Sequence, residues 1–363
     1  MKNSLKIDYL IIGAGLAGST LAWRLDQRGH SYKIIDSPKR ACASKVAAGL
    51  INPVTGKWMT QSWAIDTLLP LAKEFYQSIE KQLGVTLYRD LPVRRFFTNE
   101  GDQKRAARRI KNPRYKEYVS SILNPGDEPV GVSDALGSVT IEKSSCVDVP
   151  LFLKTLRNYF IEKGCFIEAE FQEADLIKKA ESPQPLWAYE GLDLEATHVV
   201  FCQGIHALEN TYFENLPLIP IKGDILTVHL LNRQLAHGVY YKKRWLHAFE
   251  QTPEGALCRI GATYEEDCAE ATPSPQAKEH LIESLEAILE APLEYKVIKH
   301  ASGIRPTTQD TRPLIVQHPE HPSLFAVNGL GSKGTSLAPL LSKALLDYVI
   351  DSKPLPDFDE SFK

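Results

Sequence analysis

The first forty residues alternate between apolar runs and turns in a pattern that predicts a βαβ unit. Residues 9–12 form a short, wholly apolar run, which is typical of a buried strand, and residues 13–18 contain three glycines. Residues 19–28 then have helical spacing, and residues 32–35 form a second apolar strand that ends in Asp36. A strand, a glycine turn, a helix and a second strand therefore open the chain.

The rest of the pattern predicts further helices and strands. Helical spacing occurs over residues 60–83, 102–111, 149–163 and 277–289, and a last helix follows Gly334 to about residue 350. Strand-like runs occupy residues 85–88, 94–98, 165–171, 197–202, 225–229, 238–249, 256–263 and 324–327. We expect Pro339 in the first turn of the last helix, where its missing N–H costs no hydrogen bond.

Composition narrows the class of protein. Of the 363 residues, 43% are hydrophobic, which is enough for a large core and excludes a disordered chain. The net charge of -3 provides no global attraction to nucleic acid or membranes, and no run approaches the ~20 apolar residues of a membrane span. The six cysteines show no disulfide or metal-ligand spacing, and glycines and Asp8 interrupt the apolar N-terminus, so we expect a cytoplasmic protein without a metal site.

The glycine turn fits a dinucleotide-binding fingerprint. Gly13, Gly15 and Gly18 match GxGxxG between a strand and a helix, and Asp36 follows about twenty residues later at the end of the next strand. Gly13 permits the tight turn, Gly15 allows backbone to approach a pyrophosphate, and Gly18 lets the helix pack on the strand. The alternative is a glycine turn without a ligand, and the fingerprint does not separate FAD from NAD.

Parallel-type pieces occur at the start, middle and end of the chain, with antiparallel-looking stretches between them. This interleaving predicts an α/β fold with a discontinuous, Rossmann-like dinucleotide domain and a second, substrate-binding domain with a mainly antiparallel β-sheet and flanking helices. The predicted ranges are 1–84, 146–217 and 300–363 for the first domain, and 85–145 and 218–299 for the second.

Two further stretches carry possible site residues. Residues 41–53 are rich in small side chains, which let backbone come close to a flat, bulky group. Residues 328–339 form a second glycine-rich turn that leads into a helix. With the fingerprint and residues 147–150, 199–204, 261–263 and 303–306, the chain resembles the D-amino-acid-oxidase-like flavoproteins, which include glycine oxidase and sarcosine oxidase. Residues 43–53 and 331–339 are most similar to the oxidase half of the bifunctional enzyme that modifies the tRNA wobble uridine.

The resemblance implies that FAD is the cofactor of the first domain. It implies contacts to the cofactor from Gly13, Ala14, Gly15, Leu16, Ala17, Gly18, Asp36, Ser44, Lys45, Ala48, Gly49, Leu50, Phe171, Cys202, Gly204, Arg305, Gly329, Gly331, Ser332, Lys333, Gly334 and Thr335. The terminal loop would face the pyrimidine edge of the flavin, where a helix N-terminus and Lys333 stabilise the negative charge of the reduced ring.

The resemblance also implies a substrate site. Arg305 would bind a substrate carboxylate with its guanidinium fork; the alternative is a structural arginine paired with Asp310 or a backbone carbonyl. Trp245 stands where the family often has tyrosine, so it supplies no phenol to a carboxylate. His247 is a candidate for titration near neutral pH, although a lone histidine in a strand is more often packed or exposed.

The implied reaction is oxidation of the C–N bond of an amine or amino acid, with hydride transfer to flavin N5. The imine then hydrolyses, and electrons pass to oxygen or another acceptor, a step that Lys333 is expected to promote. The alternatives are a tRNA-modifying oxidase, an NAD-dependent dehydrogenase, or a flavin-binding subunit without turnover. Nine basic residues between 94 and 116 indicate a solvated helix face or a contact with an anionic partner such as RNA.

Overall fold

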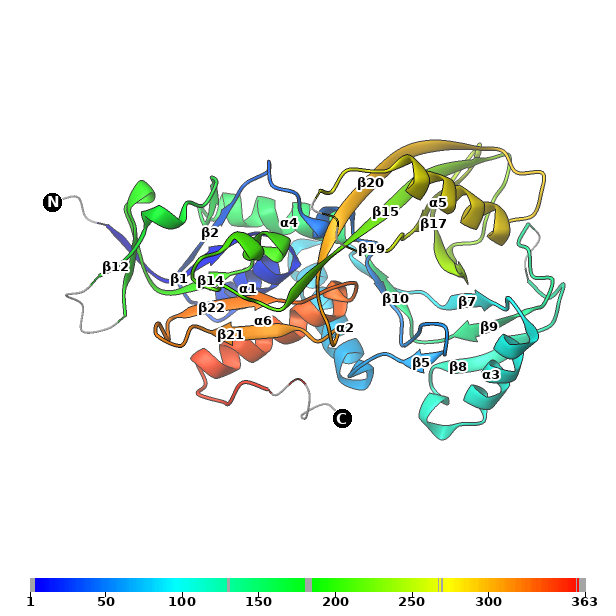
Figure 1. The fold of residues 1–363 in the computed structure, drawn as a ribbon, viewed down its shortest axis with the longest axis horizontal. Coiled ribbons are helices and arrows are strands. Elements are labelled where there is room, and N and C mark those ends of the chain that lie inside the picture. Colours follow the sequence, from blue (N-terminus) through cyan, green and yellow to red (C-terminus); the bar gives the residue numbers. More distant parts are fainter. Residues whose placement is uncertain are drawn as a thin grey trace.

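The computed structural model places a mixed α/β layer in one half of the molecule and a largely antiparallel sheet in the other (Figure 1). It describes residues 4–128, 131–179, 185–266, 268, 270–356 and 358. The α/β class that the pattern predicts is confirmed.

The first sheet has eight strands among the described residues, and its central strands are parallel. The order is β11-β2-β1-β14-β13-β12, and β22 pairs with the carboxyl half of β14, with β21 beside it. The strands are β1 (Leu5–Ile12), β2 (Tyr32–Asp36), β11 (Phe166–Glu168), β12 (Leu176–Lys178), β13 (Trp187–Tyr189), β14 (Leu194–Phe201), β21 (Leu314–Gln317) and β22 (Leu324–Asn328). β1, β14 and β22 point in one direction, so their carboxyl ends meet at one edge of the sheet.

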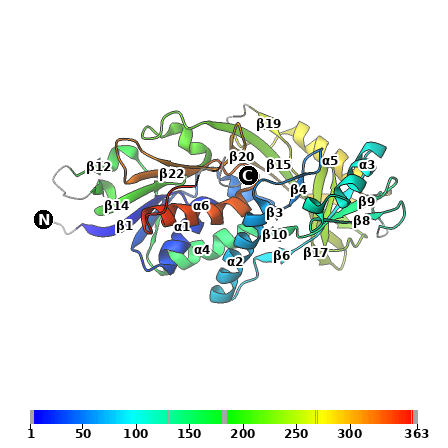
Figure 2. The same ribbon diagram turned by 90° about the horizontal axis from the view of Figure 1, so that it is seen from below.

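Helices cover this sheet and connect its strands. Helix α1 (Leu16–Gln27) packs against both α4 (Val149–Glu162) and α6 (Gly334–Val349), and α2 (Ile65–Leu83) packs against α6 (Figure 2). The first and last helices of the chain are therefore neighbours. Arg24 of α1 donates from Nη2 to the Pro339 carbonyl of α6 at 3.1 Å.

The second sheet has nine strands among the described residues, and β16 with β7 is its one parallel pair. Its order is β19-β15-β18-β17-β16-β7-β9-β8, and β20 pairs with the other side of β15. The strands are β7 (Val93–Phe96), β8 (Val119–Leu123), β9 (Ser138–Ile141), β15 (Leu218–Leu231), β16 (Gly238–Lys242), β17 (Arg244–Thr252), β18 (Gly255–Gly261), β19 (Glu265–Glu266) and β20 (Tyr295–Thr308). Helix α5 (Pro275–Ile288) packs on this sheet and α3 (Glu100–Ile110) on β8.

Short elements complete the fold (Figure 1). They are the sheet β3 (Leu50–Ile51), β10 (Ser145–Val147) and β6 (Tyr88–Asp90), the pair β4 (Val54–Thr55) and β5 (Thr60–Gln61), and the 3₁₀ turns η1 (Ala43–Val46), η2 (Pro113–Tyr115), η3 (Glu173–Asp175), η4 (Glu190–Leu192) and η5 (Gly204–Glu209). β20 spans residue 300, one boundary of the predicted domain division, which stays a prediction.

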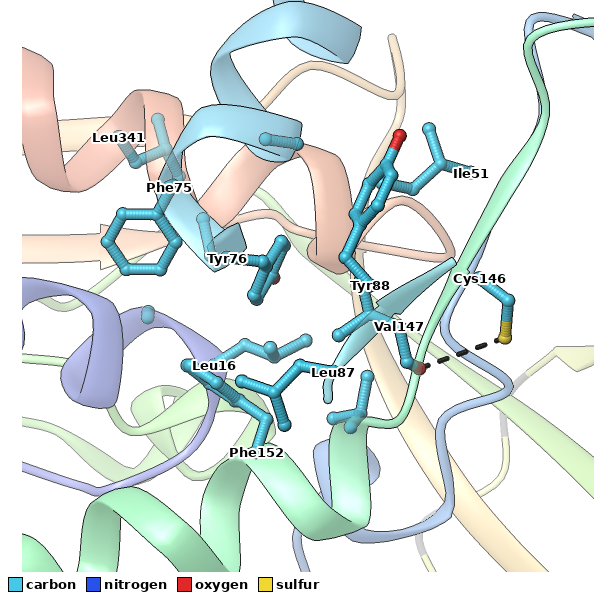
Figure 3. Close-up of a cluster of buried hydrophobic side chains, with 14 of the residues drawn as sticks. Leu16, Ile51, Phe75, Tyr76, Leu87, Tyr88, Cys146, Val147, Phe152 and Leu341 are labelled. Atoms are coloured by element: carbon cyan, nitrogen blue, oxygen red, sulfur yellow. Dashed lines mark hydrogen bonds between the residues drawn. The ribbon is translucent and has the colours of Figure 1, made fainter. Parts of the chain in front are cut away.

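A buried cluster joins residues that are far apart in the sequence. Figure 3 shows Phe75 and Tyr76 of α2 facing Leu16 of α1, Phe152 of α4 and Leu341 of α6. Tyr76 and Phe152 meet edge to face at 5.3 Å between ring centroids. This cluster fixes the amino ends of α1 and α6 relative to each other.

Pro339 lies in the second turn of α6, not in the first turn as the sequence predicts, because the helix already begins at Gly334. A residue at position 339 with an N–H would donate it to the Thr335 carbonyl, four residues earlier. In this fold the buried Tyr76 hydroxyl donates to that carbonyl instead, at 2.8 Å. The proline is tolerated because another helix supplies the missing donor.

Other expectations differ from the structure in their limits. The helix expected from residue 60 begins at Ile65, since residues 60–61 form β5. The single strand expected over 238–249 is a hairpin, β16 and β17, whose turn places Lys243 at φ 64°. The long strand β20 was not predicted, because glycine and proline interrupt its apolar pattern. Within the described ranges, no helix has the length and apolar character that a membrane span requires.

Candidate functional site

A cavity of about 510 Å³ lies between the two sheets and receives residues from both. Its walls come from the turn after β1, the segment after β2, the turn after β14, the strands β15 to β18 and β20, and the turn after β22. The opening and terminal glycine-rich loops therefore share one cavity.

The opening loop has the tight geometry that its glycines allow. Gly13 has φ +100°, and a Cβ there would lie 2.5 Å from the Cys202 carbonyl oxygen. A Cβ on Gly18 would lie 1.9 Å from the Gly13 oxygen, so α1 packs on β1 only because residue 18 has no side chain. Helix α1 begins at Leu16, and the Leu16 N–H donates to the Ser44 hydroxyl at 3.1 Å. Thus Ser44 sits at the positive end of α1.

Asp36 holds this loop from the end of the neighbouring strand. Its Oδ1 accepts the Ala14 N–H at 3.0 Å. Burial raises the pKa of Asp36, and the Ala14 hydrogen bond opposes that shift. The carboxylate also lines the cavity, where its second oxygen accepts no hydrogen bond from a described residue. It is therefore placed to accept hydrogen bonds from hydroxyl groups of a ligand.

The small residues after β2 serve two kinds of close approach. Gly49 has φ +76°, and a Cβ there would lie 1.8 Å from the Val147 carbonyl oxygen. A Cβ on Gly303 of β20 would lie 2.6 Å from Val46 and 3.2 Å from the Ala43 Cα. The segment thus fits between β10 and β20, and it lines the cavity with Ala48, Gly49 and Leu50.

The terminal loop brings a second helix N-terminus to the same cavity. Gly331 has φ +50° and donates its N–H to the Pro306 carbonyl at 3.0 Å, which ties the loop to β20. Lys333 is the N-cap residue of α6, and its side chain makes no capping hydrogen bond. Burial lowers the pKa of Lys333, and the charge of Arg312 lowers it further. A Cβ on Gly334 would lie 3.1 Å from Leu16, so the two loops are in contact.

Arg305 projects into the cavity from β20 through a space left by Gly223. Strand β15 pairs its Ile221 with Arg305 of β20, and a Cβ on Gly223 of β15 would lie 2.0 Å from Nη2 of the arginine. The guanidinium donates to the Thr263 carbonyl at 3.4 Å and to the Lys222 carbonyl at 3.5 Å, which are long hydrogen bonds. The alternative partner Asp310 forms no ion pair with Arg305 in the described part of the chain. Donor capacity therefore remains for a ligand.

Trp245 lines the cavity. Its ring packs over Gly261, where a Cβ would lie 2.9 Å from Cζ2. A phenol lies beside it on the neighbouring strand, because β16 pairs Tyr241 with Trp245 and Tyr241 also lines the cavity. Tyr264, which is 60% exposed, provides a second phenol.

His247 corrects the expectation of a titrating group in the site. It does not line the cavity; it is buried beside Cys146, with its Nδ1 3.9 Å from the Cys146 sulfur. Burial lowers the pKa of His247 to about 3, and the neighbouring His237, Arg259 and Arg89 contribute in the same direction. The ring is therefore neutral at physiological pH.

Most of the predicted site residues meet at the cavity. Those that line it are Gly13, Gly15, Leu16, Ala17, Asp36, Ser44, Ala48, Gly49, Leu50, Phe171, Cys202, Gly204, Trp245, Arg305, Gly331, Ser332, Lys333, Gly334 and Thr335. Those that do not are Ala14, Gly18, Lys45, Gly329 and His247. Lys45 extends outward to the Pro38 carbonyl at 3.4 Å, and Gly329 (φ +72°) packs against the Arg312 carbonyl.

Sequence reasoning missed several polar lining residues. They are Tyr241 of β16, Lys243 in the turn between β16 and β17, Arg244 of β17 and Tyr264 after β18. A short run of tyrosine and basic residues within the strand expected over 238–249 was the signal in the sequence, but strand pairing decides which of them share a face. Asn328 was also missed; its Nδ2 donates to the Gly204 carbonyl at 2.8 Å and joins the ends of β14 and β22.

Comparison with known proteins adds an independent result. The family model for the FAD dependent oxidoreductases (DAO) matches residues 8–348. The chain is 26% identical to a glycine oxidase of Bacillus subtilis over 98% of this chain and 96% of the relative. It is also 22% identical to the tRNA 5-methylaminomethyl-2-thiouridine biosynthesis bifunctional protein MnmC of Marinobacter nauticus, of which it spans 55%.

Solved structures share the fold along the whole chain. Glycine oxidase from Geobacillus kaustophilus aligns with a TM-score of 0.79 at 21% identity, covering 99% of this chain and 97% of that one. Iminodiacetate oxidase from Chelativorans sp. BNC1 aligns with a TM-score of 0.77 at 22% identity, covering 98% of each chain.

Proposed function

The chain belongs to the DAO family of FAD-dependent oxidoreductases, and from this premise we propose that it oxidises the C–N bond of a substrate whose carboxylate Arg305 binds. Its family uses FAD, so the NAD-dependent dehydrogenase that the fingerprint left open is set aside. Enzymes of this family act on amino acids or amines, as the names of its relatives record.

The residues of the cavity fit an FAD molecule. Two helix N-termini, those of α1 and α6, lie at one cavity. Ser44 accepts the Leu16 N–H of α1, and the other N–H groups of the two first turns have no capping side chain and can bind anionic parts of a ligand. Gly13 and Gly15 line the cavity at the first helix, and the Asp36 carboxylate has an oxygen available for ribose hydroxyls. We assign the adenosine and pyrophosphate to this end, and the flavin ring to the end near Lys333 and Arg305.

When bound, the flavin ring supplies the two-electron acceptor for the hydride that leaves the carbon next to nitrogen. The protein's part is to position the substrate: Arg305 holds the carboxylate, while Trp245 and Tyr241 form the wall beside it. The acid that lines the cavity is Asp36, at the opposite end, so no described carboxylate there is placed to take the amine proton. The substrate amine therefore enters neutral or loses its proton to solvent. Lys333 and the α6 N-terminus stabilise negative charge on the ring.

The observation that supports this proposal most directly is that Arg305 lines the same cavity as both glycine-rich loops. The test is anaerobic mixing of the yellow holoenzyme with D-amino acids, N-methylated glycines and cyclic imino acids. We expect at least one of these classes to bleach the flavin absorbance. A holoenzyme that no member of the panel reduces would contradict the proposed activity.

A second candidate function is an oxidase that acts on a nucleoside within tRNA, and one feature of the surface favours it. Trp58 is 61% exposed, Arg105 of α3 lies 4.8 Å from the centroid of its ring, and Arg109 donates to the Trp58 carbonyl at 3.0 Å. An exposed aromatic ring among basic side chains is a platform for base stacking. The flanking Thr55 and Ser62 line the cavity, so this platform lies next to the site.

Filter binding of tRNA at low and high salt tests the second candidate. RNA binding through this surface would fall steeply with salt, because phosphate contacts release counterions. Trp58→Ala should weaken it, and Ile298→Ala, which removes another exposed apolar side chain, should not. Absence of salt-sensitive retention would remove this candidate.

A further inference from the structure

The cavity carries an excess of positive charge at its substrate end. Its basic lining residues are Arg40, Lys243, Arg244, Arg305 and Lys333, and its acidic one among the described residues is Asp36. Arg40 is already paired with Glu170 and Glu209, at 3.2 and 3.5 Å. The unbalanced charge therefore belongs to the second sheet and the terminal loop.

Two of these cations stand side by side. Arg244 donates from Nη1 to the Ala262 carbonyl, and Arg305 donates to the carbonyl of the next residue, Thr263. Their guanidinium groups thus bind consecutive carbonyls on one segment of backbone. Neither arginine has a carboxylate within 4.0 Å in the portion of the chain that the structure describes. Burial lowers the pKa of Arg305, Tyr264 and Asp224 oppose that shift, and the charge of Arg244 adds to it.

A substrate with a single carboxylate would pair with one of the two guanidinium groups only. One carboxylate accepts two N–H groups from one guanidinium fork, which Arg305 alone provides. Arg244 would then lie beside Arg305, half-buried and without an anion. Its Nη1 donates to the Ala262 carbonyl, which holds the rest of the guanidinium in one orientation. Lys243, in the tight turn before β17, adds a further positive charge on the same side.

We infer that the substrate carries two carboxylates: one next to the reacting amine, bound by Arg305, and a second one bound by Arg244. The substrate class is an amino or imino dicarboxylate. The inference rests on the proposed function for the identity of the reacting amine, but the two-anion site itself does not depend on turnover. Because a guanidinium fork binds a phosphate as well as a carboxylate, inorganic phosphate is the competing anion in the test.

The first experiment measures binding without turnover. The holoenzyme is titrated with succinate, butyrate and inorganic phosphate, and binding is followed by the change in flavin absorbance and by the thermal midpoint. We expect succinate to bind about tenfold more tightly than butyrate, as a charge-assisted pair predicts. Equal binding of the two acids, or tighter binding of phosphate than of succinate, would overturn the inference.

Variants assign the second anion to a residue. Arg244→Gln should remove the preference for succinate over butyrate, and Arg244→Lys should restore part of it. The matched control is Arg259→Gln, since Arg259 lies on β18 of the same sheet but does not line the cavity. Loss of the preference in the control as well as in Arg244→Gln, or its survival in Arg244→Gln, would contradict the assignment.

Turnover then separates this inference from the proposed function. Iminodiacetate is compared with N-methylglycine, and D-aspartate with D-alanine, in anaerobic flavin reduction. A dicarboxylate preference that Arg244→Gln abolishes supports both. Reduction by the monocarboxylates alone overturns the dicarboxylate inference and keeps the proposed function, whereas tight succinate binding without reduction by any amine overturns the function and keeps the two-anion site.

Discussion

The opening loop, residues 13–18, and the proposed substrate wall, formed by Tyr241, Arg244 and Arg305 with Gly223 behind them, line the same cavity but are assembled differently. In the opening loop, Gly13, Gly18 and Asp36 lie within one βαβ unit and contact each other or their neighbours directly. In the substrate wall, Gly223, Tyr241, Arg244 and Arg305 come from four strands that only sheet pairing brings together. The geometry of the first region follows from spacing within a short segment, whereas that of the second depends on how distant strands pair. Substitutions in the opening loop should therefore reduce the flavin content, and substitutions in the substrate wall should reduce the activity.

The largest effect is expected in the opening loop, from Gly18→Val. Its Cβ would lie 1.9 Å from the Gly13 oxygen, and neither backbone segment can move away without separating α1 from β1. We expect loss of bound flavin, measured as the ratio of flavin to protein absorbance after purification. The control is Gly164→Ala, at φ +66° with open space around it, which should cost about 1 kcal/mol and keep the flavin. A yellow Gly18→Val enzyme would contradict the local packing argument.

The next effect is expected in the substrate wall, from Arg305→Met. Removing the guanidinium should lower kcat/KM by about 10³-fold, because a charged partner of a desolvated carboxylate is lost. Flavin content should stay unchanged, which distinguishes this region from the opening loop. Arg259→Gln, outside the cavity, should retain the activity. Full activity of Arg305→Met would show that the carboxylate is bound elsewhere.

Gly223→Ala tests whether the register of β15 against β20 positions the guanidinium of Arg305. The added Cβ would lie 2.0 Å from Nη2 of Arg305 and would displace the guanidinium from the cavity. A misplacement of this kind should lower kcat/KM by about 10²-fold. Added to Arg305→Met, the same substitution should have little further effect. Equal losses in both backgrounds would mean that Gly223 acts through something other than Arg305.

A smaller effect is expected where the two regions share a support. Tyr76→Phe leaves the buried Thr335 carbonyl without a donor and should lower the free energy of unfolding by about 1–3 kcal/mol, measured by denaturant titration. In a Pro339→Ala background the restored N–H replaces the tyrosine, so the cost should shrink. An undiminished cost would show that Tyr76 stabilises the helix by packing alone.

The smallest effect concerns His247 and pH. Its folded pKa of about 3 lies below the ordinary value of 6.5, so the unfolded chain binds a proton that the native state does not. Stability should therefore fall as pH drops from 6.5 towards 3, and His247→Asn should flatten this dependence by about 1–2 kcal/mol between pH 7 and pH 5. The activity profile should show no inflection from this residue near neutral pH. A slope of unfolding midpoint against pH that is unchanged in the variant would contradict this.

The amino-acid sequence predicted the family and the α/β class, which are confirmed, and it located the two glycine-rich turns between strand and helix. The glycines of residues 13–18 and the turn before α6 lie where spacing predicts them, because strand, turn and helix are local structures. The sequence also led to Arg305 and Trp245 through a resemblance that extends over most of the chain.

The surroundings of those residues depend on the tertiary structure. Burial within the sheet removed His247 from the site, and the pairing of β16 with β17 placed Tyr241 beside Trp245. Packing of α2 on α6 let Tyr76 replace the N–H that Pro339 lacks. The placing of Arg244 next to Arg305 follows from the backbone of residues 262–263, which both side chains bind. Burial, register and long-range hydrogen bonds depend on the whole fold, and no spacing within a single segment encodes them.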